Sequence, residues 1–387
     1  MKQHPIQHML KSEFIKLEEK EDSFLSEFNN KVIKLFKNAF WKSKSLKYKV
    51  FLLKTIIFQR KATRRRAKYN LHGTHVPAFL IFSVTHRCNL RCKGCYANTF
   101  RDLSGIPPKE LELNKMEQIL GEANDAGSNI VLLAGGEPFV RVKELFHLAT
   151  KFPQIIFPVF TNGTLLNQDI IQTLKKHRNI IPVLSIEGHM VETDARRGEG
   201  IYKNILNVMQ LLNQNAIFFG TSITLTRKNF TLVTNQSFIE SILGYGCKLF
   251  FYIDYVPVIS GTEELMLTEE QAESIPQITT KYQSEYPALF IGFPGDEEKM
   301  GGCLSSGRGF FHISPEGYVE PCPFAPVQAA DLNEVSFLDA LQSPLLKAIR
   351  ANHDKLVETQ SGCALWENQE WLRDLNLQVK AKKVTPG

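Results

Sequence analysis

The chain has 387 residues, 43% of them hydrophobic and 22% charged, with a net charge of +6. This composition excludes a largely disordered protein, and the length suffices for two domains with buried cores. The first residues lack the apolar core of a signal peptide, and no apolar run approaches the roughly 18 residues of a membrane-spanning helix. We therefore expect the protein to remain in the cytoplasm.

Residues 1–76 are predicted to form a basic, amphipathic helical extension. Residues 31–70 contain 14 lysines and arginines and no acidic residue. Apolar residues recur among them at helical spacing, beginning with Val32, Ile33, Phe36, Phe40 and Trp41. Three interpretations are open: a helix packed on the following domain, a peripheral helix on the inner face of an anionic membrane, or an arm that binds nucleic acid. The aromatic and leucine side chains favour a membrane over nucleic acid.

Residues 77–262 are predicted to form an α/β domain, a partial (β/α)6 barrel of the TIM type. Six apolar runs alternate with helical patterns at the spacing of βα units. They are Phe79 to Val84, Asn129 to Ala134, Ile155 to Phe160, Ile180 to Ile186, Ile217 to Leu225 and Leu249 to Tyr255. Between the first two, Asn114 is predicted to cap a helix, with Glu117 three residues on. The functional site of such a barrel lies at the carboxyl ends of its strands.

The loop after the first predicted strand carries three cysteines, Cys88, Cys92 and Cys95, in the spacing CxxxCxxC. Three thiolates can hold three irons of a [4Fe-4S] cluster and leave the fourth iron open to a small molecule. A zinc site is the alternative, but zinc takes four ligands, and only His86 lies near enough to add one. Seven cysteines in the chain, three of them in one loop, indicate metal ligands in a reducing compartment rather than disulfides.

Further polar motifs follow the next strands. Gly135-Gly136-Glu137-Pro138 comes directly after the second strand, where glycines permit close approach to a ligand and a carboxylate can accept from an ammonium group. Asn162 lies in the turn after the third strand, which equally fits a purely structural turn.

Further candidates lie at the carboxyl ends of the fourth and sixth strands. We call this edge of the predicted barrel the rim. The fourth strand ends in Ser185-Ile186-Glu187-Gly188, and the role of Glu187 is open. Arg197 follows twelve residues after Ser185, so a hydroxyl and a guanidinium are available to a carboxylate ligand. Arg196 competes with Arg197 for this role. At the end of the sixth strand, three side chains are candidates for catalysis or for lining a substrate pocket: Tyr252, Asp254 and Tyr255.

Residues 263–387 are predicted to form a smaller α+β module. Its cysteines are Cys303, Cys322 and Cys363, and a hairpin turn at Pro315 to Gly317 returns the second toward the first. These thiols suit one further iron–sulfur cluster, although together with His312 they also suit a structural zinc. Cys247 is a less favoured fourth ligand and is expected to be a buried apolar thiol.

The three-cysteine loop, followed by the aromatic Tyr96, resembles the signature of the radical S-adenosylmethionine (SAM) enzymes. The spacing of Cys303, Gly317 and Cys322 resembles the opening of the auxiliary-cluster domains called SPASM and twitch. The resemblance implies that the cysteine loop holds a SAM-binding [4Fe-4S] cluster and that the C-terminal cysteines hold a second iron–sulfur cluster. It also implies that SAM is contacted by Tyr96, Gly135, Gly136, Glu137, Pro138, Asn162, Ser185 and Arg197.

The implied activity is that of an oxidoreductase. Such an enzyme cleaves SAM reductively to a 5′-deoxyadenosyl radical, which takes hydrogen from a substrate and leads to oxidation, cyclisation or C–C or C–S bond formation. The substrate is a peptide or protein, or a lipid or isoprenoid at a membrane, and flavodoxin or ferredoxin is the expected electron donor. The alternative is a zinc-dependent module that binds nucleic acid or protein without catalysis.

Overall fold

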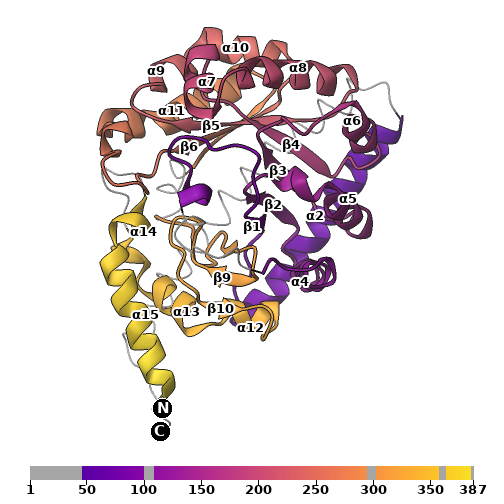
Figure 1. Ribbon diagram of the computed structural model, residues 1–387. Coiled ribbons are helices and arrows are strands. Elements are labelled where there is room, and N and C mark those ends of the chain that lie inside the picture. Colours follow the sequence, from indigo (N-terminus) through magenta and orange to yellow (C-terminus); the bar gives the residue numbers. More distant parts are fainter. Residues whose placement is uncertain (1–45, 100–108, 294–301, 357–362, 385–387) are drawn as a thin grey trace.

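The computed structural model describes residues 46–99, 109–293, 302–356 and 363–384 (Figure 1). Part of the predicted N-terminal extension, including Val32, Phe36 and Trp41, lies outside these residues. The remainder forms one helix, α2, over Leu46–Leu71.

The described strands form one open sheet in the order β10-β9-β8-β1-β2-β3-β4-β5-β6-β7. Strands β1 to β7 are all parallel to their neighbours. Their bounds are Phe79–Thr85, Ile130–Gly135, Phe157–Thr161, Ile180–Ser185, Gly220–Leu225, Leu249–Asp254 and Leu289–Phe293. The six predicted strands and the partial barrel are confirmed, and β7 extends the sheet beyond them.

Helices connect these strands and lie on the outer side of the curved sheet in Figure 1. Apolar faces of the helices pack against the sheet and form the main core. The helices are α4 (Leu113–Ala126), η1 (Pro138–Arg141), α5 (Val142–Lys151), α6 (Gln168–Leu174), α7 (Met190–Arg197), α8 (Ile201–Gln214), α9 (Phe230–Val233), α10 (Gln236–Gly244), η2 (Glu263–Leu265) and α11 (Glu269–Glu285).

The predicted cap of α4 is wrong. The helix begins earlier than expected, with Glu112 at the N-cap position, so Asn114 already lies inside the first turn. Glu117 does not complete a capping box either, because its carboxylate pairs with His147 and Lys151 on the neighbouring helix α5.

The C-terminal segments add three short strands and four α-helices in the described residues. β8 (His312–Ile313) pairs in parallel with β1, and β9 (Tyr318–Glu320) returns antiparallel beside β8. The predicted hairpin turn is confirmed, since Gly317 has a φ of 97° and Ser314 N donates to Tyr318 O at 2.8 Å. The remaining elements are β10 (Ala330–Asp331), α12 (Phe337–Leu341), α13 (Pro344–Ala351), η4 (His353–Lys355), α14 (Ala364–Glu367) and α15 (Gln369–Val384).

The predicted division at residue 262 does not coincide with an end of the sheet. β7 lies beyond that residue and pairs with β6, and β8 lies further on and pairs with β1. The C-terminal module therefore shares hydrogen bonds with the barrel strand that precedes the cysteine loop.

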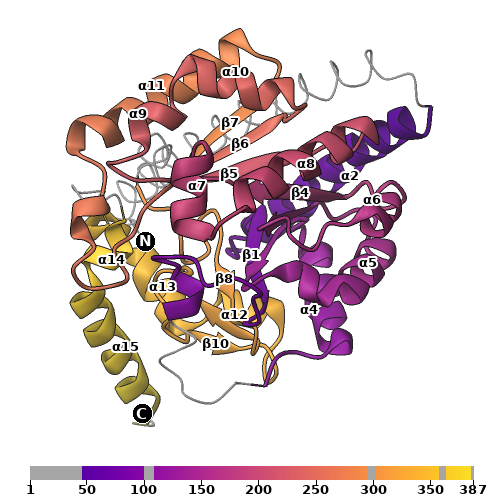
Figure 2. The same cartoon turned by 45° about the horizontal axis from the view of Figure 1, so that its top comes forward.

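Helix α2 packs through its second half on the C-terminal end of α4. Arg66 Nη1 donates to Gly127 O at 2.6 Å, and Ala62 is buried beside the same glycine. The first half exposes Val50, Leu53 and Ile57, at 42%, 50% and 50%. Figure 2 shows this end of α2 extending past α6. Within the described residues, no helix combines the length and apolar character needed to cross a bilayer.

Candidate functional site

The predicted site residues of the barrel gather at one edge of the sheet. The cysteine loop follows β1, the Gly135 to Pro138 motif follows β2, and Asn162 follows β3. Ser185 and Asp254 are the last residues of β4 and β6. Because parallel strands end at the same edge, residues far apart in the sequence become neighbours there.

The three-cysteine loop is held in place by two hydrogen bonds between the Lys93 backbone and Arg196 of α7. Lys93 N donates to Arg196 O at 2.9 Å, and Arg196 Nε donates to Lys93 O at 3.1 Å. The three thiols are partly buried and lie within electrostatic reach of one another. Burial raises the pKa of Cys88, and it also raises the pKa of Cys92 although Arg197 acts in the opposite direction. Thiols kept protonated in this way are deprotonated when they bind a metal.

The donor set fits an iron–sulfur cluster. Three thiols lie on one short loop, and two arginines beside Cys92 can offset the negative charge of thiolates. Across the described residues, no three His, Cys, Asp or Glu side chains converge on a single metal-ion position. A cubane cluster does not require that convergence, because each thiolate binds a separate iron.

The two glycines of the second motif make room for the cysteine loop itself. A Cβ on Gly136 would lie 2.2 Å from Arg87 O, and one on Gly135 would lie 2.4 Å from Thr85 O. Gly136 N donates to Thr85 O at 2.7 Å, and Glu137 N donates to Arg87 O at 2.8 Å. The motif therefore fixes the start of the cysteine loop against β2.

The Glu137 carboxylate has hydrogen-bond partners within the protein. It is buried and already accepts from Phe139 N at 3.1 Å, Thr161 Oγ1 at 2.8 Å and Asn162 N at 2.8 Å. Burial raises the pKa of Glu137, and these hydrogen bonds oppose the rise. The carboxylate thus joins the ends of β2 and β3.

Asn162 also contacts the cysteine loop. Its Nδ2 donates to Asn89 Oδ1 at 2.9 Å, while its Oδ1 accepts from Thr164 N at 2.9 Å. Asn89 lies between Cys88 and Cys92, so the turn after β3 supports the loop from a second side. The structural interpretation of this turn accounts for these contacts.

The structure shows the contacts of Glu187, whose role the sequence left open. Glu187 is buried two residues after β4, and its Oε1 accepts from Arg197 Nε at 2.8 Å and lies 2.9 Å from Arg196 Nη1. Burial lowers the pKa of Arg197, but Glu187 and Cys92 outweigh this effect and raise it. Its buried Oε2 accepts no hydrogen bond from the described residues. An acidic residue nine and ten positions before the adjacent Arg196 and Arg197 was the signal in the sequence.

Two of the three C-terminal cysteines lie in one apolar cluster, and the third, Cys363, is next to it in the chain. Cys303 and Cys322 are buried in it together with Ala364, the residue after Cys363. Ser306 N donates to Pro321 O at 3.0 Å, so the segments that carry Cys303 and Cys322 lie side by side.

His312 does not suit the zinc site that the sequence left open. Its Nδ1 donates to Glu320 Oε2 at 2.7 Å, and its Nε2 lies 2.7 Å from Ser83 Oγ. Both ring nitrogens are therefore engaged within the sheet. Cys247 is a buried thiol as expected: its Sγ donates to Leu249 O, and burial raises its pKa to about 12.

Tyr96 lies between the two groups of cysteines. Its ring contacts Phe324 with centroids 5.1 Å apart, and its pKa is raised by burial and by the proximity of Cys95 and Cys322. This aromatic side chain thus links the barrel rim to the C-terminal module.

The three catalytic candidates at the end of β6 lie in different environments in the structure. Tyr252 is buried, and its hydroxyl donates to Val233 O at 3.1 Å in the helical layer, so the expectation that it lines the rim is wrong. Tyr255 does reach the rim, because a Cβ on Gly94 of the cysteine loop would lie 3.0 Å from its hydroxyl. Asp254 is buried at the end of the strand.

The structure thus combines an open parallel α/β barrel with three thiols at the carboxyl edge of its sheet. This combination is typical of one class of iron–sulfur enzymes. Residues 82–231 match the radical SAM superfamily. These residues form a radical SAM domain, so the predicted resemblance is confirmed for this part of the chain, and the enzymes of this superfamily use a [4Fe-4S] cluster and SAM. The zinc-dependent binding module is no longer needed as an alternative.

Three known proteins illustrate the similarity. The AdoMet-dependent heme synthase of Methanosarcina barkeri is 27% identical over 292 residues, which make up 68% of this chain and 82% of that protein. The antilisterial bacteriocin subtilosin biosynthesis protein AlbA of Bacillus subtilis is 26% identical over 285 residues, 70% of this chain and 61% of that protein. The crystal structure of Streptococcus suis SuiB bound to precursor peptide SuiA shares the fold, with a TM-score of 0.58, 19% identity and coverage of 80% of this chain and 74% of that chain.

Proposed function

We propose that the protein cleaves SAM at a cluster held by Cys88, Cys92 and Cys95 and modifies a peptide by removing hydrogen from it. The observation that carries the proposal is the three-cysteine loop at the carboxyl edge of the sheet, with Arg196 and Arg197 beside Cys92. The net reaction is an oxidation, a cyclisation or the formation of a C–C or C–S bond.

The cluster supplies the electron for SAM cleavage, which yields the hydrogen-abstracting 5′-deoxyadenosyl radical. The chain positions the cofactor. Arg197 would bind the SAM carboxylate while Glu187 holds the guanidinium in orientation. Glu187 Oε2, buried and without a hydrogen-bond partner in the described residues, would accept from a hydroxyl of the cofactor. Ser185, hydrogen-bonded to Ser222 at 3.1 Å, lies at the same edge.

A second cluster is proposed at Cys303, Cys322 and Cys363. Support comes from the apolar cluster that contains Cys303, Cys322 and Ala364, the neighbour of Cys363, and from His312, which is engaged with Glu320 and Ser83. Tyr96 lies near both cysteine groups and excludes water from the space between them.

A peptide is favoured as the substrate by the names of several relatives. They include a bacteriocin biosynthesis protein, a PqqA peptide cyclase that is 25% identical over 312 residues, and a fold relative solved with a precursor peptide. Haem synthesis is the second candidate, because the M. barkeri heme synthase is matched over 82% of its length.

Two partners complete the proposal. Flavodoxin or ferredoxin donates the electron. The first half of α2 contacts an anionic membrane, since the exposed Val50, Leu53 and Ile57 lie close in sequence to Lys54 and Lys61.

The cluster assignment is tested by iron and sulfide analysis with Mössbauer spectra. Anaerobically purified wild type should contain about eight irons per chain, and the triple alanine variant of Cys88, Cys92 and Cys95 about four. Cys247→Ala is the control and should retain the wild-type content. Zinc with little iron in the wild type would refute the assignment.

The substrate class is tested by deuterium transfer into 5′-deoxyadenosine. The enzyme is incubated with SAM, a reductant and one of three perdeuterated preparations: a peptide digest, an iron porphyrin or lipid vesicles. Deuterium from the peptides alone supports the proposal. Transfer from the porphyrin would support haem synthesis instead. Transfer from the lipids would identify a membrane lipid as the substrate.

Membrane contact is tested by vesicle sedimentation. Replacing Val50, Leu53 and Ile57 with serine should reduce binding to phosphatidylglycerol vesicles. Leu377→Ser is the matched control, because Leu377 is 65% exposed on α15. Equal binding of both variants would contradict the role of α2.

A further inference from the structure

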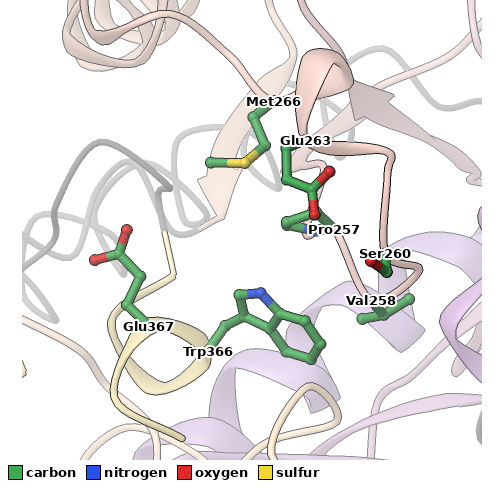
Figure 3. Close-up of a pocket in the computed structure, with 7 residues that line it drawn as sticks. All are labelled: Pro257, Val258, Ser260, Glu263, Met266, Trp366 and Glu367. Atoms are coloured by element: carbon green, nitrogen blue, oxygen red, sulfur yellow. The ribbon is translucent and has the colours of Figure 1, made fainter.

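The C-terminal segments face the barrel at two places near the rim. At one of them a pocket of about 450 Å³ separates the two sides, with Trp366 of α14 across from Pro257 and Val258, which follow β6 (Figure 3). At the other, the hairpin turn between β8 and β9, hydrogen bonds join the two sides directly. This second contact lies where the cysteine loop begins.

The start of the cysteine loop is held from two sides. The loop leaves β1 at Thr85, the last residue of the strand, and reaches Cys88 three residues later. On the side of β2, backbone hydrogen bonds hold it in place. On the other side the contacts come from two carboxylates: Glu110 lies before α4, and Glu316 lies in the hairpin turn.

Glu316 binds the ring of His86. The distance between Glu316 Oε1 and His86 Nε2 is 2.7 Å, and Glu316 Oε2 accepts from Ser314 Oγ at 2.6 Å within the same turn. Burial raises the pKa of Glu316, but the hydrogen bonds from His86 and Ser314 outweigh this effect and lower it. The carboxylate is therefore ionised at neutral pH, and His86 Nε2 is the donor because a carboxylate only accepts.

The hairpin turn is fixed against the segment before α4. Pro315 O accepts from Leu111 N at 2.7 Å, and a Cβ on Gly317 would lie only 2.9 Å from Leu111 Cδ2. The buried Arg141 donates to Leu111 O and to Val84 O, both at 2.9 Å, and so joins this segment to β1. The carboxylate in the turn therefore has a fixed position relative to the end of β1.

Glu110 binds the backbone at the same point. Its Oε1 accepts from Thr85 Oγ1 at 2.6 Å and from His86 N at 2.8 Å. His86 is thus held through its backbone by one carboxylate and through its ring by another. Because Cys88 is two residues further on, a shift of His86 would also move this thiol.

We propose that Glu316 is a positioning residue for SAM cleavage, which acts by holding His86 and thereby fixing Cys88. The C-terminal module then contributes to the reaction at the rim through its hairpin turn as well as through its own cysteines. The inference rests on the proposed function, because it takes Cys88 as a ligand of the SAM-binding cluster.

The test compares Glu316→Ala with Glu316→Gln in the full-length protein. Alanine removes the acceptor for His86, so the rate of 5′-deoxyadenosine formation from SAM and dithionite should fall about 10- to 100-fold, the range for groups that orient metal ligands. Glutamine keeps an oxygen that can accept from the ring and should restore most of the rate. Glu334→Ala is the matched control, because Glu334 is an exposed carboxylate of the same module.

A merely structural ion pair would behave differently. The side chains of His86 and Glu316 are 24% and 18% exposed, so the loss of this pair should change the midpoint of urea unfolding only slightly. A structural role therefore predicts a small change in stability and a wild-type rate in the folded Glu316→Ala variant.

Hydrogen exchange of the purified proteins measures the positioning without turnover. The amides of residues 86–95 should exchange about fivefold faster in Glu316→Ala than in the wild type, the effect of losing one partly exposed ion pair. Glu316→Gln and Glu334→Ala should exchange at the wild-type rate.

His86→Ala removes the same contact from the other side and keeps the proposal testable if Glu316→Ala does not fold. It should lower the rate of SAM cleavage by a similar factor, and the double variant should be no slower than either single variant. Wild-type cleavage or wild-type exchange in the folded Glu316→Ala variant, or additive losses in the double variant, would overturn the proposal.

The positioning role and the proposed function fail separately. If the wild type forms no 5′-deoxyadenosine, the cluster chemistry is refuted. The hydrogen-exchange comparison still decides whether Glu316 positions the cysteine loop, because it requires neither SAM nor a reductant.

Discussion

Replacing Gly136 with alanine tests how the second motif supports the cysteine loop. The added Cβ would lie 2.2 Å from Arg87 O and 2.8 Å from His86 O, closer than carbon and oxygen can approach. Both oxygens belong to backbone, so no side chain can move aside. The loop that begins at Arg87 must shift by about 1 Å, a displacement that costs on the order of 100-fold in rate where geometry is critical. Overpacking of this kind also destabilises by about 1–3 kcal/mol.

Iron content, 5′-deoxyadenosine formation and urea unfolding measure these effects. Gly121→Ala is the matched control, because the same added atom on α4 meets only Phe152 Cε1, at 3.9 Å. A glycine inside a helix costs roughly 0.5–1 kcal/mol relative to alanine, so the control should be slightly stabilised and fully active. Normal iron content and cleavage rate in Gly136→Ala would refute the supporting role of this glycine.

Three further predictions concern buried side chains. Tyr252→Phe should lose about 1 kcal/mol of stability in urea unfolding, because only the hydrogen bond to Val233 O is lost. Its rate of SAM cleavage should be unchanged, and a large fall in this rate in the folded variant would show that Tyr252 takes part in the reaction. Glu187→Gln should weaken SAM binding by about tenfold or more in equilibrium dialysis, since Arg196 and Arg197 lose their anionic partner; unchanged affinity would show that Glu187 does not orient them. Cys247 has a pKa raised from 9.0 to about 12, so its ionisation favours the unfolded state as the pH rises above 9. The stability advantage of wild type over Cys247→Ala should therefore shrink by about 1.4 kcal/mol per pH unit between pH 9 and 12, and a constant advantage in unfolding experiments would contradict this.

The parallel strands of the barrel were predictable because each is an apolar run followed by a turn and a helix. β7 was missed since its five residues follow a long helix and precede no recognisable motif. β8 has only two residues, and its parallel pairing with β1 depends on a partner more than 200 positions away, which no local pattern records.

The cysteines of the site were predictable from spacing, whereas the directions of the polar side chains were not. The motif at Glu137 did not reveal that three donors from neighbouring strand ends contact this carboxylate. Alternation along β6 could not distinguish the two faces of the strand, since both are covered, and Tyr252 lies on the face toward the helices. Glu187 contacts Arg196 and Arg197 only because α7 packs against the end of β4, an arrangement that the local sequence does not show.

The pairing of β1 with both β2 and β8 bears on how the chain is synthesised. Until residue 313 has left the ribosome, β1 is an edge strand whose apolar residues and unpaired backbone groups are open to other chains. Nascent chains that stop before this point, and recombinant fragments that end at residue 262, should therefore aggregate even though all six predicted barrel strands are present.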